Sequence, residues 1–220
     1  MKKTSSGHVL MHDPAAGRGS ERTLLGGLKT KNVDVVVTRN GIGPVIAISM
    51  KGTLNAFRNL TNRMEEAVGD CTNLHISYPA LVYGFLHVLK ANVESEGVHP
   101  NDVFVHSDGT MSDSIIRYHD VMARLTGRAD VRNEVSRYEA VSLLSAAASD
   151  QAHDHIFEAF PDRTSTLHFD RFMNTLYGKY DERFVYAAPA LKSKTRRLEW
   201  DPGSPAFSEL NFKDFLLRTR

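Results

Sequence analysis

The fold of this chain is constrained most by two runs of β-branched residues. A short turn joins these runs, and a helical pattern follows them at once. The runs cover residues 33–38 and 45–50, and the turn over 39–44 is rich in Asn, Gly and Pro. Strand-forming runs separated by an Asn-Gly turn predict a β-hairpin. After Gly52 the apolar spacing changes to about 3.6 residues, which predicts a helix that ends near 69–70. We therefore expect a hairpin that leads directly into a helix packed on its own sheet.

The remainder of the chain predicts further elements of the same unit. An apolar stretch over 81–89 is typical of a buried strand. Further helices are expected at 20–29, 114–125, 131–148 and 169–177. Because no linker divides the chain, residues 1–220 are expected to form one α/β domain. Its core is expected at about 20–90, followed by a mainly helical C-terminal portion at about 110–220.

Composition narrows the class of protein. With 220 residues, 41% of them hydrophobic and 24% charged, the chain has ordinary globular composition, which excludes disordered, collagen-like and disulfide-rich proteins. The single cysteine, Cys71, excludes an intramolecular disulfide and suits a reducing compartment. The apolar stretch over 79–89 is too short to cross a bilayer, and the first residues lack the apolar segment of a signal peptide. We therefore expect a soluble, cytoplasmic protein.

The distribution of charge along the chain is uneven. Basic residues outnumber acidic ones in 1–32 and in 191–220, whereas acidic residues outnumber basic ones in 33–190. This pattern suits a polyanionic partner, but solvated tails on a neutral domain would produce it equally well. Charge alone therefore does not assign a partner.

Three polar residues of the expected hairpin and helix form a candidate catalytic site. Asp34 lies in the first strand, Lys51 ends the second, and Glu65 lies on the polar face of the helix. The hairpin places Asp34 beside Lys51, and the helix returns a carboxylate to the same edge. Mg²⁺ prefers oxygen ligands, and one or two carboxylates suffice when phosphate supplies the rest. Such a metal lowers the pKa of a bound water, while a lysine orients that water and counters phosphate charge.

These residues resemble the motif of the PD-(D/E)xK nuclease superfamily. Ser49, Met50 and Lys51 place a serine where that motif usually has an acid. The arrangement is similar to a subgroup of type II restriction endonucleases that has Ser-x-Lys and takes the missing acid from the following helix. Thirteen residues separate Lys51 from Glu65, which is the spacing of that subgroup. By this resemblance Asp34 and Glu65 are metal ligands, Lys51 is the catalytic lysine, and Met50 offers its backbone carbonyl to the metal.

The resemblance also implies a fold and a function. The fold is restriction-endonuclease-like, with a central mixed β-sheet flanked by helices. The function is Mg²⁺-dependent hydrolysis of double-stranded DNA at a specific sequence, leaving 5′-phosphate ends. Cutting both strands calls for two active sites, so a homodimer or higher homo-oligomer is expected. A restriction system further implies a cognate DNA methyltransferase, and no membrane partner is expected.

Two questions stay open at this point: which function the chain has, and which glutamate is the acid on the helix. The chain is also compatible with a repair, transposition or phage-defence nuclease that works with partner subunits, with a non-catalytic DNA-binding protein of the same fold, or with a plain interaction domain. Glu66 is the rival of Glu65 as the helix acid. It projects about 100° further round the helix, next to Arg63 and Asn59.

Other motifs carry weaker signals. His153 and His155 share one side only on a strand, so a surface cluster is favoured over a metal site. The stretch 118–120 contains His119 and Asp120 but no nucleophile in a recognisable elbow. Possible DNA contacts are Arg117, Arg124, Arg128 and Arg132, together with Asn55, Arg58, Asn59, Asn62 and Arg63 on the first long helix.

Overall fold

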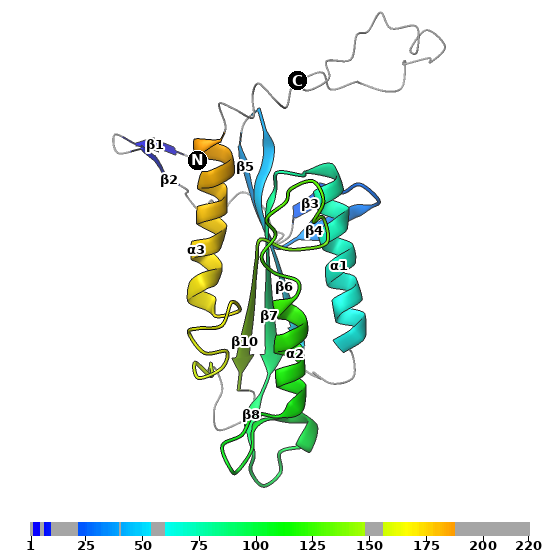
Figure 1. Cartoon of the computed structure of the whole chain (residues 1–220), viewed down its shortest axis with the longest axis vertical. Coiled ribbons are helices and arrows are strands. Elements are labelled where there is room, and N and C mark those ends of the chain that lie inside the picture. Colours follow the sequence, from blue (N-terminus) through cyan, green and yellow to red (C-terminus); the bar gives the residue numbers. More distant parts are fainter. Residues whose placement is uncertain are drawn as a thin grey trace, which may run out of the picture.

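A four-stranded mixed sheet forms the centre of the computed structural model, which describes residues 2–4, 7–9, 22–39, 41–53, 60–147 and 156–187. The strand order is β10–β7–β6–β5 (Figure 1). The strands are β5 (Val35–Arg39), β6 (Gly43–Thr53), β7 (Val82–Lys90) and β10 (Ala140–Ala146). β5 is antiparallel to β6, whereas β6, β7 and β10 run parallel to one another. The described chain is therefore mixed α/β.

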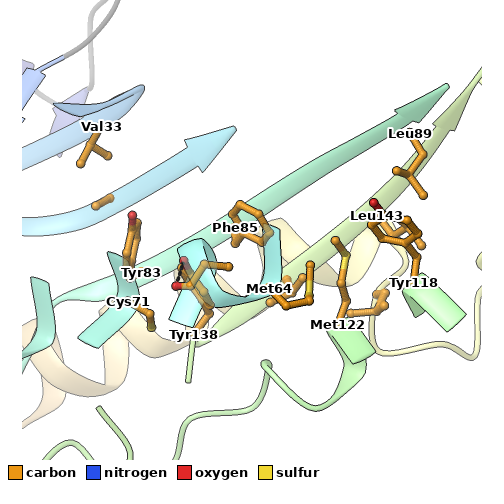
Figure 2. Close-up of a cluster of buried hydrophobic side chains, with 14 of the residues drawn as sticks. Val33, Met64, Cys71, Tyr83, Phe85, Leu89, Tyr118, Met122, Tyr138 and Leu143 are labelled. Carbon is orange, nitrogen blue, oxygen red and sulfur yellow. Dashed lines mark hydrogen bonds between the residues drawn. The ribbon is translucent and has the colours of Figure 1, made fainter. Parts of the chain in front are cut away.

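Helices cover both faces of this sheet (Figure 1). Helices α1 (Leu60–Ser77) and α2 (Asp113–Ala123) pack on one face, where buried side chains such as Met64, Tyr83 and Tyr118 form the larger core (Figure 2). Helix α3 (Phe169–Tyr180) packs on the other face and continues into the π-helix η2 (Asp181–Tyr186). Because α1 connects two parallel strands, it is the crossover helix between β6 and β7.

Short strand pairs and a 3₁₀ turn accompany the central sheet. They are β1 (Lys2–Thr4) with β2 (Gly7–Val9), β3 (Arg22–Leu25) with β4 (Thr30–Val33), β8 (Asn92–Val93) with β9 (Val103–Val105), and the 3₁₀ helix η1 (Pro100–Asp102). The first two pairs are antiparallel and the third is parallel. The β8 region extends beyond the carboxyl ends of β7 and β10 (Figure 1).

Most of the elements expected from the sequence are present. The hairpin is confirmed as β5 and β6, with Gly41 and Gly43 at φ values of 78° and 102° in its turn. Both values lie in the left-handed region that glycine adopts most readily. Helices α1, α2 and α3 and strand β7 are confirmed as well, although α1 continues past its expected end at 69–70. Residues 54–59, where the sequence predicts the start of that helix, lie outside the described residues.

The prediction of a helix at 20–29 is wrong, because the described part of this stretch contains β3 and the start of the β3–β4 turn. The turn is held by Asn73 of α1, whose Oδ1 accepts hydrogen bonds from the backbone N–H groups of Leu28 and Lys29 at 2.8 and 3.0 Å. The Gly27 N–H also donates to the Asn73 carbonyl at 2.8 Å. These tertiary contacts override the local helical spacing.

The prediction of a helix at 131–148 is wrong as well. Residues 131–138 are irregular, and β10 pairs in parallel with β7 from Ala140↔Gly84 onward. The C-terminal portion is therefore not mainly helical where it is described, because it contributes an edge strand to the central sheet. Residues 148–155 and 188–220 lie outside the described part of the chain.

Candidate active site at the edge of strand β6

Asp34 lies where the chain passes from β4 into β5, and its carboxylate reaches strand β6. Its Oδ2 accepts a hydrogen bond of 2.7 Å from the backbone N–H of Met50. Pairing between β5 and β6 begins at Val35↔Ile48, so Met50 lies beyond the last paired residue. The N–H and C=O of one strand residue point to the same side. The Met50 carbonyl therefore lies on the same edge as Asp34.

Lys51 follows Met50 and points to the face covered by α1. Its Nζ lies 3.5 Å from Oε1 of Glu66, and its side chain keeps 34% of its surface exposed. It is paired in register with His87 of β7, which is fully buried. Burial and the charge of Arg63 lower the pKa of His87 to about 4, so this histidine is neutral at pH 7.

Of the two adjacent glutamates, Glu66 contacts Lys51. Its Oε2 also accepts a hydrogen bond of 2.8 Å from Nη1 of Arg63, one helical turn earlier. Burial alone would raise the pKa of Glu66, but the Arg63 hydrogen bond and the charges of Lys51, Arg63 and Lys31 lower it overall. Glu65 is exposed to solvent. The buried residues Met64 and Ala67 set which face of α1 meets the sheet, and Glu66 flanks that face.

Ser49, the residue in the motif's usual acid position, is buried. Its Oγ shares a hydrogen bond of 2.7 Å with the Tyr83 hydroxyl, and only 2% of the residue is exposed. Burial raises the pKa of Tyr83, so this contact joins two neutral hydroxyl groups. Ser49 therefore serves the core between β6 and β7, and the second acid of a metal site has to come from another element.

Oxygen ligands suit a hard cation, and this region offers two carboxylates. Asp34 accepts the Met50 N–H, and Glu66 lies beside Lys51. Among the described residues no group of three or more His, Cys, Asp or Glu side chains is assembled for a metal ion. A magnesium site with one or two carboxylates and substrate phosphate does not require such a group. The donors present therefore fit Mg²⁺ better than Zn²⁺.

The other candidate residues divide into three groups. Arg128 is fully buried in an ion pair with Glu139, so the prediction that it contacts DNA is wrong. The remaining described candidates on the surface are Arg117, Arg124, Arg132 and Asn62, which are exposed. His153, His155, Asn55, Arg58 and Asn59 lie outside the described residues.

His119 forms a second polar arrangement, which the sequence alone did not indicate. Its Nε2 lies 2.8 Å from Oγ of Ser165, and its Nδ1 lies 3.4 Å from the exposed carboxylate of Asp120. Ser165 Oγ also accepts the Leu167 N–H at 3.1 Å, which fixes the hydroxyl in a turn. The contact between His119 and Ser165 therefore lies within a turn that the Leu167 N–H also stabilises.

Comparison with known proteins adds no family to this geometry. No protein-family model, curated protein or solved structure matches the chain. Within the part of the chain that the structure describes, no helix combines the length and apolar character needed to cross a membrane. Function is therefore argued from the residues at the β6 edge alone.

Proposed function

We propose that this protein is a Mg²⁺-dependent DNA endonuclease, of the type II restriction class, that hydrolyses double-stranded DNA at a specific sequence. The observation that carries the proposal is that Asp34 accepts the backbone N–H of Met50, the residue before Lys51, and that Glu66 of the crossover helix lies 3.5 Å from this lysine. Sequence reasoning selected Asp34 and Lys51 from their order along the chain, and the fold supports that pairing.

Each residue has a definite part in this proposal. Asp34, Glu66 and the Met50 carbonyl would hold the cation, which would lower the pKa of the attacking water and neutralise charge on the phosphate. Lys51 orients that water and counters the charge that develops on the phosphate oxygens. Oδ2 of Asp34 accepts the Met50 N–H, so Oδ1 is the oxygen that would face the metal. We further propose a homodimer, since both strands of a duplex must be cut.

Purified protein incubated with long unmethylated phage DNA, with and without Mg²⁺, tests the proposal. We expect discrete Mg²⁺-dependent fragments, and a loss of about 10²–10⁴-fold in rate for Asp34→Ala and Lys51→Ala. Lys179→Ala serves as the control, because Lys179 lies on α3 on the opposite face of the sheet, where it pairs with Glu182 at 2.7 Å. It should cut like the wild type.

Two other outcomes would redirect the proposal. A folded wild type that binds DNA but never cuts it would favour a nuclease that needs partner subunits, or a non-catalytic DNA-binding protein. Absence of DNA binding even at low salt, where phosphate contacts are strongest, would favour an interaction domain.

A further inference from the structure

The two oxygens of the Glu66 carboxylate meet two different cations at different distances. Oε2 accepts the hydrogen bond of 2.8 Å from Arg63, whereas Oε1 lies 3.5 Å from Nζ of Lys51. The first is a short, charge-assisted hydrogen bond, and such bonds are roughly twice as strong as neutral ones. The second is a looser ion pair. Arg63 therefore fixes the carboxylate, and Oε1 stays turned toward the lysine.

The guanidinium of Arg63 is itself held in place by its surroundings. It lies close enough to His87 and Tyr118 for its charge to act on the pKa of both. Its Nε is buried and has no hydrogen-bond acceptor among the described residues. A buried donor without an acceptor costs free energy, and an arginine free to move would turn it toward water. The Nε atom is thus buried although the side chain as a whole keeps 36% of its surface exposed, and Nη1 is the atom that donates to Glu66.

We infer that Arg63 is a positioning residue, which orients Glu66 so that Oε1 faces the metal position beside Lys51. This inference rests on the proposed function, because it assigns Glu66 as the acid of that site. Carboxylates that bind metals are commonly held by such outer hydrogen bonds, whose loss costs 10- to 100-fold in metal affinity. The planar fork of arginine suits this role better than a lysine ammonium does.

When Arg63 is replaced, the direction in which Mg²⁺ affinity changes distinguishes a positioning role from a purely electrostatic one. Removing a cation beside a metal site would by itself strengthen binding of Mg²⁺, because one repulsive charge is lost. Removing an orienting hydrogen bond weakens binding instead. Calorimetric titration of Mg²⁺ into the full chain measures this directly, with no need for DNA cleavage.

For Arg63→Met we expect Mg²⁺ affinity to fall by about 10- to 100-fold. Arg63→Lys, which keeps the charge and one donor, should lie between this variant and the wild type. Arg171→Met is the matched control, because Arg171 is exposed on α3, and it should bind Mg²⁺ like the wild type. In cleavage assays Arg63→Met should need more Mg²⁺, while kcat at saturating Mg²⁺ and KM for DNA stay near the wild-type values.

The possible failures are separable. Unchanged or tighter Mg²⁺ binding by both Arg63 variants, or a raised KM for DNA with normal Mg²⁺ affinity, would overturn the positioning role and leave the nuclease proposal standing. A wild type that binds Mg²⁺ but cuts no DNA would overturn the proposed function, while the calorimetric comparison still reports on Arg63. A wild type that neither binds Mg²⁺ nor cuts DNA would overturn both.

Discussion

At the scale of single residues, the burial of Ser49 means that the second acid of the proposed site has to come from another element. The side chain lies under α1 with its hydroxyl on Tyr83, so a carboxylate at this position would be removed from water. Lys51, two residues later on the same face, keeps 34% of its side-chain surface exposed. Glu66 then supplies a negative charge beside it from outside the strand.

The choice between Glu65 and Glu66 is also a residue-scale question, and it shows how far sequence can specify the site. The sequence predicts that Asp34 lies on the strand next to Lys51, because hairpin register follows from local turn chemistry, and their roles remain a proposal. The helix acid could not be selected in this way. A spacing of thirteen residues favours Glu65, but the rotation of α1 is set by which of its side chains are buried on the sheet. That rotation brings Glu66 to Lys51.

Paired variants of these glutamates test this assignment. Glu66→Gln should lower the rate of Mg²⁺-dependent DNA cleavage by about 10²–10³-fold, because it removes a charge in contact with Lys51. Glu65→Gln should change the rate little, because Glu65 is exposed to solvent. Single-turnover cleavage at saturating Mg²⁺ measures both. The opposite ranking would assign the metal ligand to Glu65 and show that α1 rotates when DNA and metal bind.

At the scale of elements, close packing of α3 on β7 depends on a glycine in the strand. A Cβ built on Gly84 would lie 2.8 Å from Cζ of Phe172 and 3.0 Å from Cδ1 of Leu176. Phe172 is 2% exposed, so its ring has little room to move. Gly84 is also the residue at which β10 begins to pair with β7. The absence of a side chain therefore permits the helix and both strands to meet.

Two glycine-to-alanine variants test this packing. Gly84→Ala should lower the free energy of unfolding by about 1–3 kcal/mol through overpacking. Gly69→Ala, on the exposed face of α1 with no atom within 4 Å of the new Cβ, should raise it by about 0.5–1 kcal/mol. Urea unfolding followed by circular dichroism measures both changes. Equal effects in the two variants would show that α3 yields freely to the added methyl group.

The predictions from the sequence were wrong for the elements whose structure depends on residues distant in the chain. Strand β10 has an apolar pattern that periodicity alone does not separate from a buried helix, and its partner β7 lies more than fifty residues earlier. The β3–β4 turn likewise depends on Asn73 of α1. By contrast, the β5–β6 hairpin and helix α2 are defined by neighbouring residues, and both were predicted correctly.

At the scale of the whole molecule, the buried carboxylate of Glu139 connects elements on both sides of the sheet. Its two oxygens accept hydrogen bonds from the Tyr83 N–H at 2.7 Å and from Arg128 at 3.0 Å, and one also lies 2.7 Å from Arg183 of η2. His75 of α1 lies 3.5 Å away. Glu139 therefore joins β7, α1, the segment before β10 and the π-helix in one charged cluster.

The pKa of Glu139 makes this cluster sensitive to acid. Burial alone would raise the pKa, but His75 and the charge of Arg183 lower it to about 2. A carboxyl group whose folded pKa lies below its unfolded value stabilises the fold fully above the unfolded value of 4.5. This contribution is lost progressively as the pH falls from 4.5 toward 2.

Replacing Glu139 with glutamine should therefore have an effect that depends on pH. Near pH 7, Glu139→Gln should lower the free energy of unfolding by about 3–5 kcal/mol, because Arg128 and Arg183 are left buried without their counter-charge. Glu96→Gln, at an exposed position, is the matched control and should change it by less than about 0.5 kcal/mol. As the pH falls from 4.5 toward 2, the wild type loses the carboxylate's contribution and the variant has none to lose, so the two free energies should converge. Urea unfolding at pH 7, 4.5 and 3 measures the difference. A constant difference across these pH values would mean that Glu139 keeps the same affinity for its proton in the folded and unfolded chain, and that the cluster joins these elements through shape and not through charge.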